Sequence, residues 1–130
     1  MLRVLVVEDN RIFREAFKQS LCEHFHSMVI DEAANSEEAS QRINVAPPHL
    51  IFIDIRLPGM NGLKLTQKIK KDFPNIHIAI MTGYDMPEYR QAALQYGADL
   101  FLVKESLKWD EVVTLVKSIP PDTSSEPEKR

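Results

Sequence analysis

The sequence contains a single cysteine, Cys22, so no disulfide can form within the chain. It has no apolar stretch long enough to cross a membrane. The apolar run at its N-terminus, within residues 1–7, is too short for the core of a signal peptide. Because unpaired cysteine is typical of reducing compartments, these absences predict a cytoplasmic protein with no membrane association.

The chain also lacks an excess of basic residues. It carries 16 Lys and Arg against 19 Asp and Glu, for a net charge of -3, so we expect no direct binding of nucleic acid by this chain. Its 130 residues favour one domain that can bury a core without disulfides. We place that domain at residues 1–119. Residues 120–130 are polar and predict a flexible tail or the start of an interdomain linker.

Apolar runs and amphipathic segments alternate five times along the chain. Strands are predicted at residues 4–7, 28–33, 50–55, 76–81 and 99–103, and helices at 12–25, 36–45, 62–72, 86–96 and after Ser106, which can cap the last helix. This alternation predicts an α/β fold, a doubly wound (βα)5 arrangement around a parallel five-stranded sheet. We choose the flavodoxin-like strand order 2-1-3-4-5.

Four of the predicted strands end in residues that carry chemistry. Glu8 and Asp9 follow the first strand, Asp54 the third, Thr82 the fourth and Lys104 the fifth. In such sheets ligands bind at the carboxyl ends of the strands. Three carboxylates there would repel one another, and Mg²⁺ would relieve the repulsion. Because a lysine and a hydroxyl beside the metal suit a phosphoryl group, the residues predict magnesium-assisted phosphorylation of Asp54, the central carboxylate.

Other functions remain possible at this point. A phosphatase that forms an aspartyl phosphate needs a second aspartate two residues after the nucleophile, but Arg56 occupies that position. A nucleotide-binding protein would need a glycine-rich loop after the first strand, where Glu8, Asp9 and Asn10 stand instead. Each acid taken alone is more often a helix cap or a solvated group, so the prediction depends on their combination.

Several motifs together resemble the receiver domain of bacterial two-component response regulators, over residues 2–119. They are Val4-Leu5-Val6-Val7-Glu8-Asp9-Asn10, the stretch from Asp54 to Gly62, Met81-Thr82-Gly83, and the stretch from Gly97 to Lys104. Glu105-Ser106, in place of a proline after the lysine, is similar to receivers of the LuxR/NarL type and makes a cis peptide improbable. The resemblance implies a phosphoacceptor that takes its phosphoryl group from a sensor histidine kinase.

The resemblance also implies roles for individual residues. Asp54 would be the phosphoacceptor, and Lys104 would pair with the phosphoryl oxygens. The Mg²⁺ ligands would be Asp9 directly, Glu8 largely through water, Asp54, and the backbone carbonyl of Arg56.

Two further roles concern the response to phosphorylation. Thr82 would be the switch hydroxyl and Phe101 the switch aromatic, although an aromatic in a strand is equally often a core residue. Arg56 and Tyr84 occupy the variable positions that tune the lifetime of the phosphoryl group in receiver domains, and the resemblance does not say what their effect is here.

As a signalling module, the chain would catalyse only its own phosphorylation and dephosphorylation. We expect a transcriptional output through a DNA-binding domain absent from this chain; the alternative is a stand-alone receiver that acts by protein–protein interaction. A scaffold that no longer takes phosphate also stays open. A homodimer could form through the fourth helix, fifth strand and fifth helix, where Met86, Tyr89 and Trp109 form a patch unless they pack inward. Cys22 is expected to be a small core residue.

Overall fold

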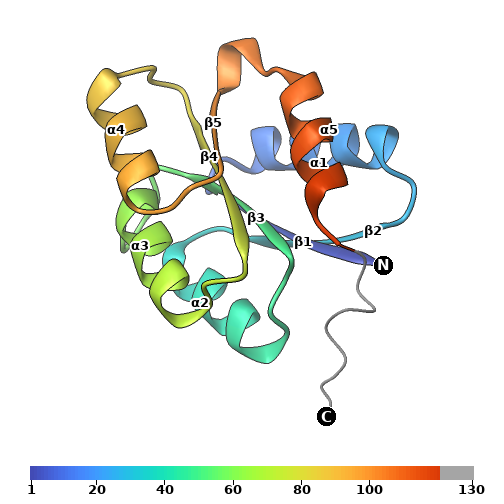
Figure 1. Cartoon of the computed structure of the whole chain (residues 1–130), viewed down its shortest axis with the longest axis horizontal. Coiled ribbons are helices and arrows are strands. Elements are labelled where there is room, and N and C mark those ends of the chain that lie inside the picture. Colours follow the sequence, from blue (N-terminus) through green and yellow to red (C-terminus); the bar gives the residue numbers. More distant parts are fainter. Residues whose placement is uncertain (121–130) are drawn as a thin grey trace.

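Five parallel strands form a single sheet in the computed structural model, which describes residues 1–120. The strands are β1 (Leu2–Val7), β2 (Met28–Ala33), β3 (Leu50–Asp54), β4 (His77–Thr82) and β5 (Leu100–Val103). The helices are α1 (Arg11–His24), α2 (Ser36–Val45), α3 (Gly62–Asp72), α4 (Pro87–Gln95) and α5 (Trp109–Ser118), with a short 3₁₀ turn, η1 (Lys104–Ser106). The strand order is β2-β1-β3-β4-β5, which confirms the predicted fold (Figure 1).

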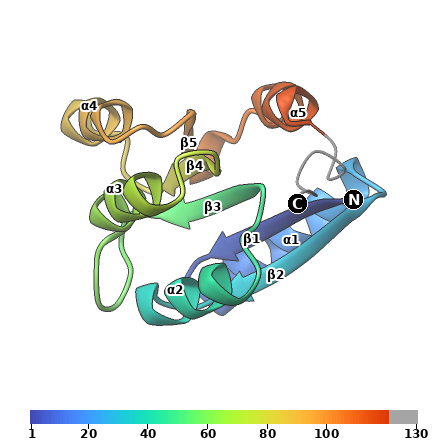
Figure 2. The same ribbon diagram turned by 60° about the horizontal axis from the view of Figure 1, so that its bottom comes forward.

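The register of the strands brings their carboxyl ends to one edge. Val7 pairs with Ile53, Asp54 with Met81, and Thr82 with Val103. Figure 2 shows β1 and β3 side by side in the middle of the sheet and β2 and β5 at its two margins. The residues that follow these strands therefore meet along a single line, which is the condition for the predicted site.

Helices cover both faces of the sheet, so the core has two layers. One layer packs α2, α3 and α4 against strand residues such as Ile51, Ile53 and Ile80, and the other packs α1 and α5 against Phe52 and Met81. Figure 1 shows α1 and α5 together on one side and α2, α3 and α4 on the other. All five residues of β3 are buried, as expected of a central strand in a parallel sheet.

Asparagine begins each of the first three helices. The side-chain oxygens of Asn10, Asn35 and Asn61 accept hydrogen bonds from backbone N–H groups three residues later, at 2.8–3.0 Å. The prediction that Ser106 caps the last helix is wrong. Ser106 lies in η1, and α5 begins after Lys108 without a side-chain cap.

Two other expectations about packing have clear outcomes. Cys22 is exposed, so its assignment to the core is wrong, because its helix buries the neighbouring Leu21 together with Phe17. Trp109 packs inward instead, stacked between Phe17 and His24 with ring centroids 5.5 and 4.3 Å away.

Within residues 1–120, no peptide bond is cis and no helix has the length and apolar character needed to cross a membrane. The predicted tail or linker, apart from Pro120, lies outside the described residues.

Candidate phosphorylation site

A crevice opens at the carboxyl edge of the sheet, with a volume of 370 Å³. Two carboxylates enter it from the ends of buried strands, Glu8 with 0% and Asp54 with 5% of its surface exposed, whereas Asp9 is exposed. The crevice is lined by Glu8, Asp9, Asn10, Asp54, Arg56, Gly83, Tyr84 and Lys104. Every residue predicted to bind the metal ion or the phosphoryl group lines this crevice, except Thr82. Thr82 is buried at the end of β4.

Lys104 joins the two buried carboxylates. Its Nζ lies 2.5 Å from Glu8 Oε1 and donates a hydrogen bond of 3.3 Å to Asp54 Oδ2. The contact with Glu8 lacks hydrogen-bond geometry and is an ion pair. The same ammonium stands 4.5 Å from the ring centroid of Phe13, within cation–π distance. The lysine is thus held on three sides at the mouth of the crevice.

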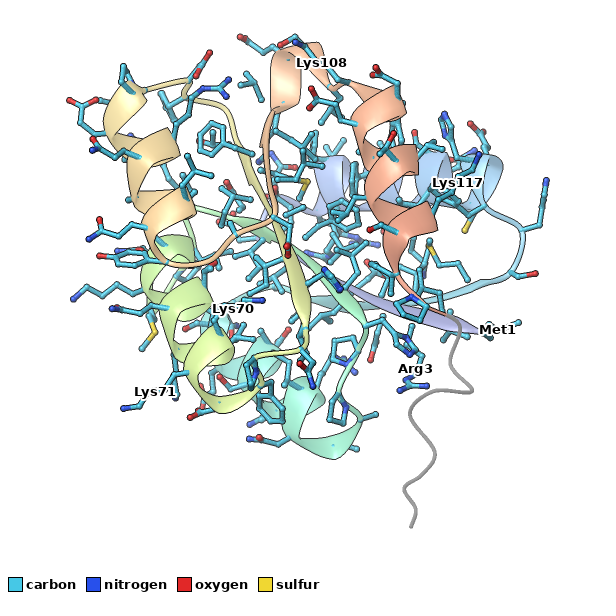
Figure 3. The ribbon with its side chains drawn as sticks, in the orientation of Figure 1. Met1, Arg3, Lys70, Lys71, Lys108 and Lys117 are labelled. Carbon is cyan, nitrogen blue, oxygen red and sulfur yellow. The ribbon has the colours of Figure 1, made fainter. Side chains whose placement is uncertain are left out.

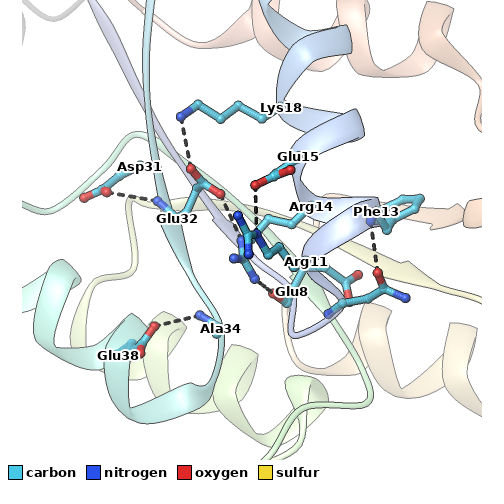
Figure 4. Close-up of polar contacts among 11 residues, drawn as sticks. Glu8, Arg11, Phe13, Arg14, Glu15, Lys18, Asp31, Glu32, Ala34 and Glu38 are labelled. Carbon is cyan, nitrogen blue, oxygen red and sulfur yellow. Dashed lines mark hydrogen bonds and ion pairs between the residues drawn. The ribbon is translucent and has the colours of Figure 1, made fainter.

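The backbone after β1 is fixed by hydrogen bonds from both sides. Asn10 N–H donates to Glu8 Oε2 at 2.9 Å, and Arg14 Nη1 donates to the backbone carbonyl of Glu8 at 2.7 Å. Arg14 also pairs with Glu32 at 2.9 Å, and Lys18 pairs with the other oxygen of Glu32 at 3.0 Å (Figure 4). This network ties α1 to β2 and holds the position from which Glu8 and Asp9 project.

The surroundings of Glu8 and Glu32 shift the pKa values of these two acids in opposite directions. Burial raises the pKa of Glu8, and Asp54 adds to the rise, while Lys104 and the Asn10 N–H oppose it. The hydrogen bonds from Lys18 and Arg14 lower the pKa of Glu32. Glu8 is therefore a carboxylate whose charged form is disfavoured by its surroundings and would be stabilised by a cation.

Three carboxylates meet closely enough to bind one ion. One oxygen from each of Glu8, Asp9 and Asp54 lies within 4.8 Å of the others. A set of hard oxygen donors, with one exposed member and an open crevice beside it, fits a cation that keeps part of its water shell. Lys104 offsets only one of the three negative charges, so the electrostatic need for a cation persists.

Glycine allows the loop after β3 to close against the backbone of Asp54, the predicted phosphoacceptor. A Cβ atom on Gly62 would lie 2.1 Å from the backbone oxygen of Asp54, and the Gly62 N–H donates to the carbonyl of Ile55 at 2.8 Å. The same loop is held to α2 by Ser36 Oγ, which accepts from the Met60 N–H at 2.9 Å. No side chain is compatible with this approach of the two backbones, which explains the glycine.

The predicted switch residues lie on neighbouring strands. Thr82 Oγ1 accepts a hydrogen bond from the Tyr84 N–H at 3.0 Å, so the hydroxyl turns towards its own loop. Phe101 is half-buried, lies outside the crevice, and is covered by the Arg90 guanidinium 4.7 Å from its ring centroid. Arg90 in turn pairs with Asp85 at 2.7 Å, which connects the loop after Thr82 to the side chain of Phe101.

The two residues assigned to phosphoryl lifetime contact each other. The guanidinium of Arg56 stacks over the ring of Tyr84, 4.0 Å from its centroid. One comes from the loop after β3 and the other from the loop after β4, so the pair spans the open side of the crevice.

Sequence reasoning missed the supporting residues Phe13, Arg14 and Arg90. Phe13 and Arg14 lie in the first turn of α1, which starts at the end of β1 and so must face the site. The position of Arg14 in the sequence could therefore have indicated that it lies near the site. Nothing in the sequence indicated a role for Arg90, because its contact with Phe101 depends on how α4 packs on β5.

Comparison with known proteins assigns the chain to a family. Residues 4–117 match the response regulator receiver domain. The chain belongs to this family.

Receiver domains of DNA-binding regulators are among its relatives. The chain is 29% identical over 119 residues to the oxygen regulatory protein NreC of Staphylococcus carnosus, covering 91% of this chain and 54% of NreC. A DNA-binding response regulator of the LuxR family from Staphylococcus aureus superposes with a TM-score of 0.81 at 27% identity, covering 91% of this chain and 98% of that one.

A third similar protein was solved with a ligand. Response regulator TrrA of Thermotoga maritima, in complex with Mg(2+)-BeF, is 35% identical with a TM-score of 0.78, covering 91% of this receiver domain and 98% of TrrA. The chain spans only 27% to 54% of the length of the curated relatives that it matches.

Proposed function

We propose that this receiver domain takes a phosphoryl group onto Asp54 from a sensor histidine kinase. The observation that supports the proposal is the convergence of Asp54, two further carboxylates and Lys104 in one crevice. One Asp54 oxygen would attack the phosphorus of the kinase phosphohistidine. A P–O bond would form as the P–N bond breaks, and the imidazole would leave.

Mg²⁺ is the metal that we assign to the acidic cluster. Asp9 and Asp54 would be ligands through their carboxylates and Arg56 through its backbone carbonyl, with Glu8 acting largely through water. The ion of a bound complex would neutralise the charge that accumulates on the transferring phosphoryl group. The pairing of Glu8 with Lys104 supports the assignment of Glu8 to a supporting role, since its oxygens already have a cation and an N–H as partners.

Lys104 and Thr82 would bind the oxygens of the phosphoryl group on Asp54. The ammonium already contacts Asp54 Oδ2, so a phosphoryl oxygen on Asp54 would extend towards it and replace part of the Glu8 pairing. The Thr82 hydroxyl would leave the Tyr84 N–H and donate to another phosphoryl oxygen.

The response would reach the surface through Phe101. Movement of Thr82 inward vacates volume between β4 and β5, and Phe101 would turn to fill it because packed interiors do not tolerate voids. The Arg90 guanidinium would have to leave the Phe101 ring for this to happen. The face formed by α4, β5 and α5 would then change, and we propose it as the surface of a homodimer.

The Arg56–Tyr84 pair would tune the lifetime of the phosphoryl group. Their stacked side chains, which line the crevice, would restrict the approach of water to the phosphorus atom of a phosphorylated Asp54. Replacing either residue by alanine is then expected to speed loss of the phosphoryl group.

The output proposed for this receiver, which we assign to residues 1–119, is control of transcription through a DNA-binding domain outside this chain. The similarity to LuxR-family regulators supports this output. The alternative is a stand-alone receiver that acts by contact with other proteins.

Phosphorylation of Asp54 is tested with acetyl phosphate and Mg²⁺, followed by mass spectrometry of the trapped acyl phosphate. We expect one added phosphoryl group in the wild type and none in Asp54→Asn. Asp31→Asn is the matched control, because Asp31 is an exposed carboxylate of β2 that pairs with Arg42 and does not line the crevice. Full labelling of the Asp54→Asn protein would refute the assignment.

A further inference from the structure

The aromatic ring of Phe13 faces the ammonium group of Lys104. Lys104 Nζ lies 4.5 Å from the centroid of this ring, while Glu8 Oε1 and Asp54 Oδ2 lie 2.5 and 3.3 Å from the same nitrogen. Both carboxylates have roles in the proposed phosphorylation chemistry, but Phe13 does not line the crevice and has none. The ring is therefore a direct neighbour of a reacting group without an assigned function.

An aromatic face holds a lysine in a different way from a carboxylate. The face attracts the positive charge through the quadrupole of the ring, and an ammonium has three N–H donors to share among oxygen atoms. The Lys104 side chain is 19% exposed, so the contact with the ring is partly shielded from water. The ring can thus attract the ammonium while its N–H groups stay directed at the oxygens of Asp54 or of a phosphoryl group.

The position of the Phe13 ring is fixed by its own contacts. The Phe13 N–H donates a hydrogen bond of 3.0 Å to Asn10 Oδ1 in the first turn of α1 (Figure 4). One turn later, Phe17 stacks on the ring, with centroids 5.9 Å apart and the two planes 11° from parallel. Because Phe17 is buried, it gives the Phe13 ring a rigid base.

The aromatic stack also reaches the strand that carries the phosphoacceptor. Phe17 meets Phe52 edge to face, with ring centroids 4.9 Å apart. Phe52 is buried in β3 two residues before Asp54, so the two side chains leave the strand on the same face of the sheet. The ring that contacts the lysine and the carboxylate that would accept the phosphoryl group are thus held by one packed unit.

We propose that Phe13 is a positioning residue for Lys104. Its ring keeps the ammonium beside Asp54 while the lysine exchanges Glu8 for a phosphoryl oxygen, a step that belongs to the proposed function, on which this inference rests. The four-carbon stem of a lysine is flexible, so loss of the ring would let the ammonium leave this position. Phosphorylation would then slow, because the charge that stabilises the transferring group is no longer held in place.

The rate of phosphorylation by acetyl phosphate at saturating Mg²⁺ tests the proposal. Phe13→Leu should lower the maximal rate by about 2- to 30-fold, the range that corresponds to a cation–π contact. Phe13→Tyr keeps an aromatic face and should restore most of the rate. The matched control is Phe25→Leu, since Phe25 packs against the same core layer at the other end of α1. Equal loss of rate in Phe25→Leu would make the effect structural and overturn the proposal.

A second lysine background shows whether Phe13 acts through Lys104. Phe13→Leu should cause no further loss of rate in Lys104→Met, because the partner of the ring is then absent. It should keep its full effect in Lys108→Met, since Lys108 is exposed at the start of α5 and does not line the crevice (Figure 3). The same loss in the Lys104→Met and Lys108→Met backgrounds would overturn the proposal.

The side-chain resonances of Lys104 give a readout that does not depend on activity. Protons above an aromatic face are shifted upfield by its ring current, so we expect upfield Hε resonances in the wild type and in Phe25→Leu. Phe13→Leu should remove the shift, and Phe13→Tyr should retain it. Unshifted Hε resonances in the wild type would overturn the contact and the proposal with it.

The labelling of the wild type separates this inference from the proposed function. A wild-type protein that takes no phosphoryl group onto Asp54 would overturn the proposed function and this inference together. Labelling of the wild type with an unchanged rate in Phe13→Leu would overturn the role of Phe13 alone.

Discussion

The two edges of the sheet are built on different physical principles. At the carboxyl edge, two buried carboxylates and one lysine contact one another at a crevice of 370 Å³, and the backbone of Gly62 packs closely against that of Asp54. At the amino edge, prolines, aromatic and aliphatic side chains surround 810 Å³, and His49 and Asp99 accept hydrogen bonds from neighbouring backbone N–H groups. Coupled groups suit chemistry that changes charge. Mutations should therefore spread their effects at the first edge and stay local at the second.

Gly62→Ala is expected to have the largest effect, because its Cβ would overlap the backbone of Asp54. Relief of the overlap must displace the loop or β3, which should lower the free energy of unfolding by about 1–3 kcal/mol. Denaturant titration measures the change. Gly83→Ala is the matched control at the same edge of the sheet, since a Cβ there has no neighbour within 4 Å, and its free energy of unfolding should stay within about 0.5 kcal/mol of the wild type. Similar losses for both glycines would contradict the close-approach argument.

Mg²⁺ affinity should separate the two neighbouring acids of the crevice. Asp9→Asn removes an exposed carboxylate assigned as a direct ligand, whereas Glu8→Gln alters a group already paired with Lys104. We expect Asp9→Asn to weaken binding by about tenfold or more and Glu8→Gln to weaken it less. Titration followed by fluorescence of Trp109, or by calorimetry, gives the two constants. A larger loss in Glu8→Gln would reverse the assignment of the two acids.

The pH dependence of stability should change sign between Glu8 and Glu32. Because burial raises the pKa of Glu8, the folded state binds its proton more tightly than the unfolded state, and this contribution is lost as pH rises from about 4.5 through the raised pKa. Glu8→Gln should therefore gain stability relative to the wild type across that window.

Glu32 is the control for this prediction. Its lowered pKa gives stability that is present above 4.5 and lost as pH falls through the folded-state pKa. Glu32→Gln should therefore be less stable than the wild type at neutral pH, with the difference shrinking in acid. Unfolding curves at a series of pH values test both. Parallel curves for Glu8→Gln and the wild type would mean that Glu8 has no unfavourable burial.

Asp99→Asn should produce the smallest change in the free energy of unfolding. It tests whether mutations at the amino edge have only local effects. The amide oxygen can still accept from the Ile78 N–H, which donates to Asp99 Oδ2 at 2.9 Å, and only the charge beside His77 is lost. We expect a loss below about 1 kcal/mol and an unchanged Mg²⁺ affinity. A change in Mg²⁺ affinity would show that the two edges are coupled, and the comparison between them would fail.

Much of the carboxyl edge could be predicted from the sequence because its residues stand directly after strands. Asp54 and Lys104 each follow an apolar run, and a parallel sheet must bring such positions to one edge. Phe13 and Arg90 could not be predicted in the same way, because their contacts depend on helix rotation and on rotamers. Cys22 was misplaced because the expectation used the apolar character of cysteine and not its position on the helix, which buries Leu21 and leaves Cys22 exposed.

The sequence by itself determined the alternation of strands and helices and the set of acids that follow strands, because these follow from hydrophobic period and chain connectivity. It limited the strand order to a few topologies, and the structure decided among them. Only the tertiary structure decided that Lys104 bridges Glu8 and Asp54, that Arg90 covers Phe101, and that a cleft lies at the other edge. Such features arise where side chains from segments far apart in the sequence meet at particular distances. Periodicity along the chain carries no information about those distances.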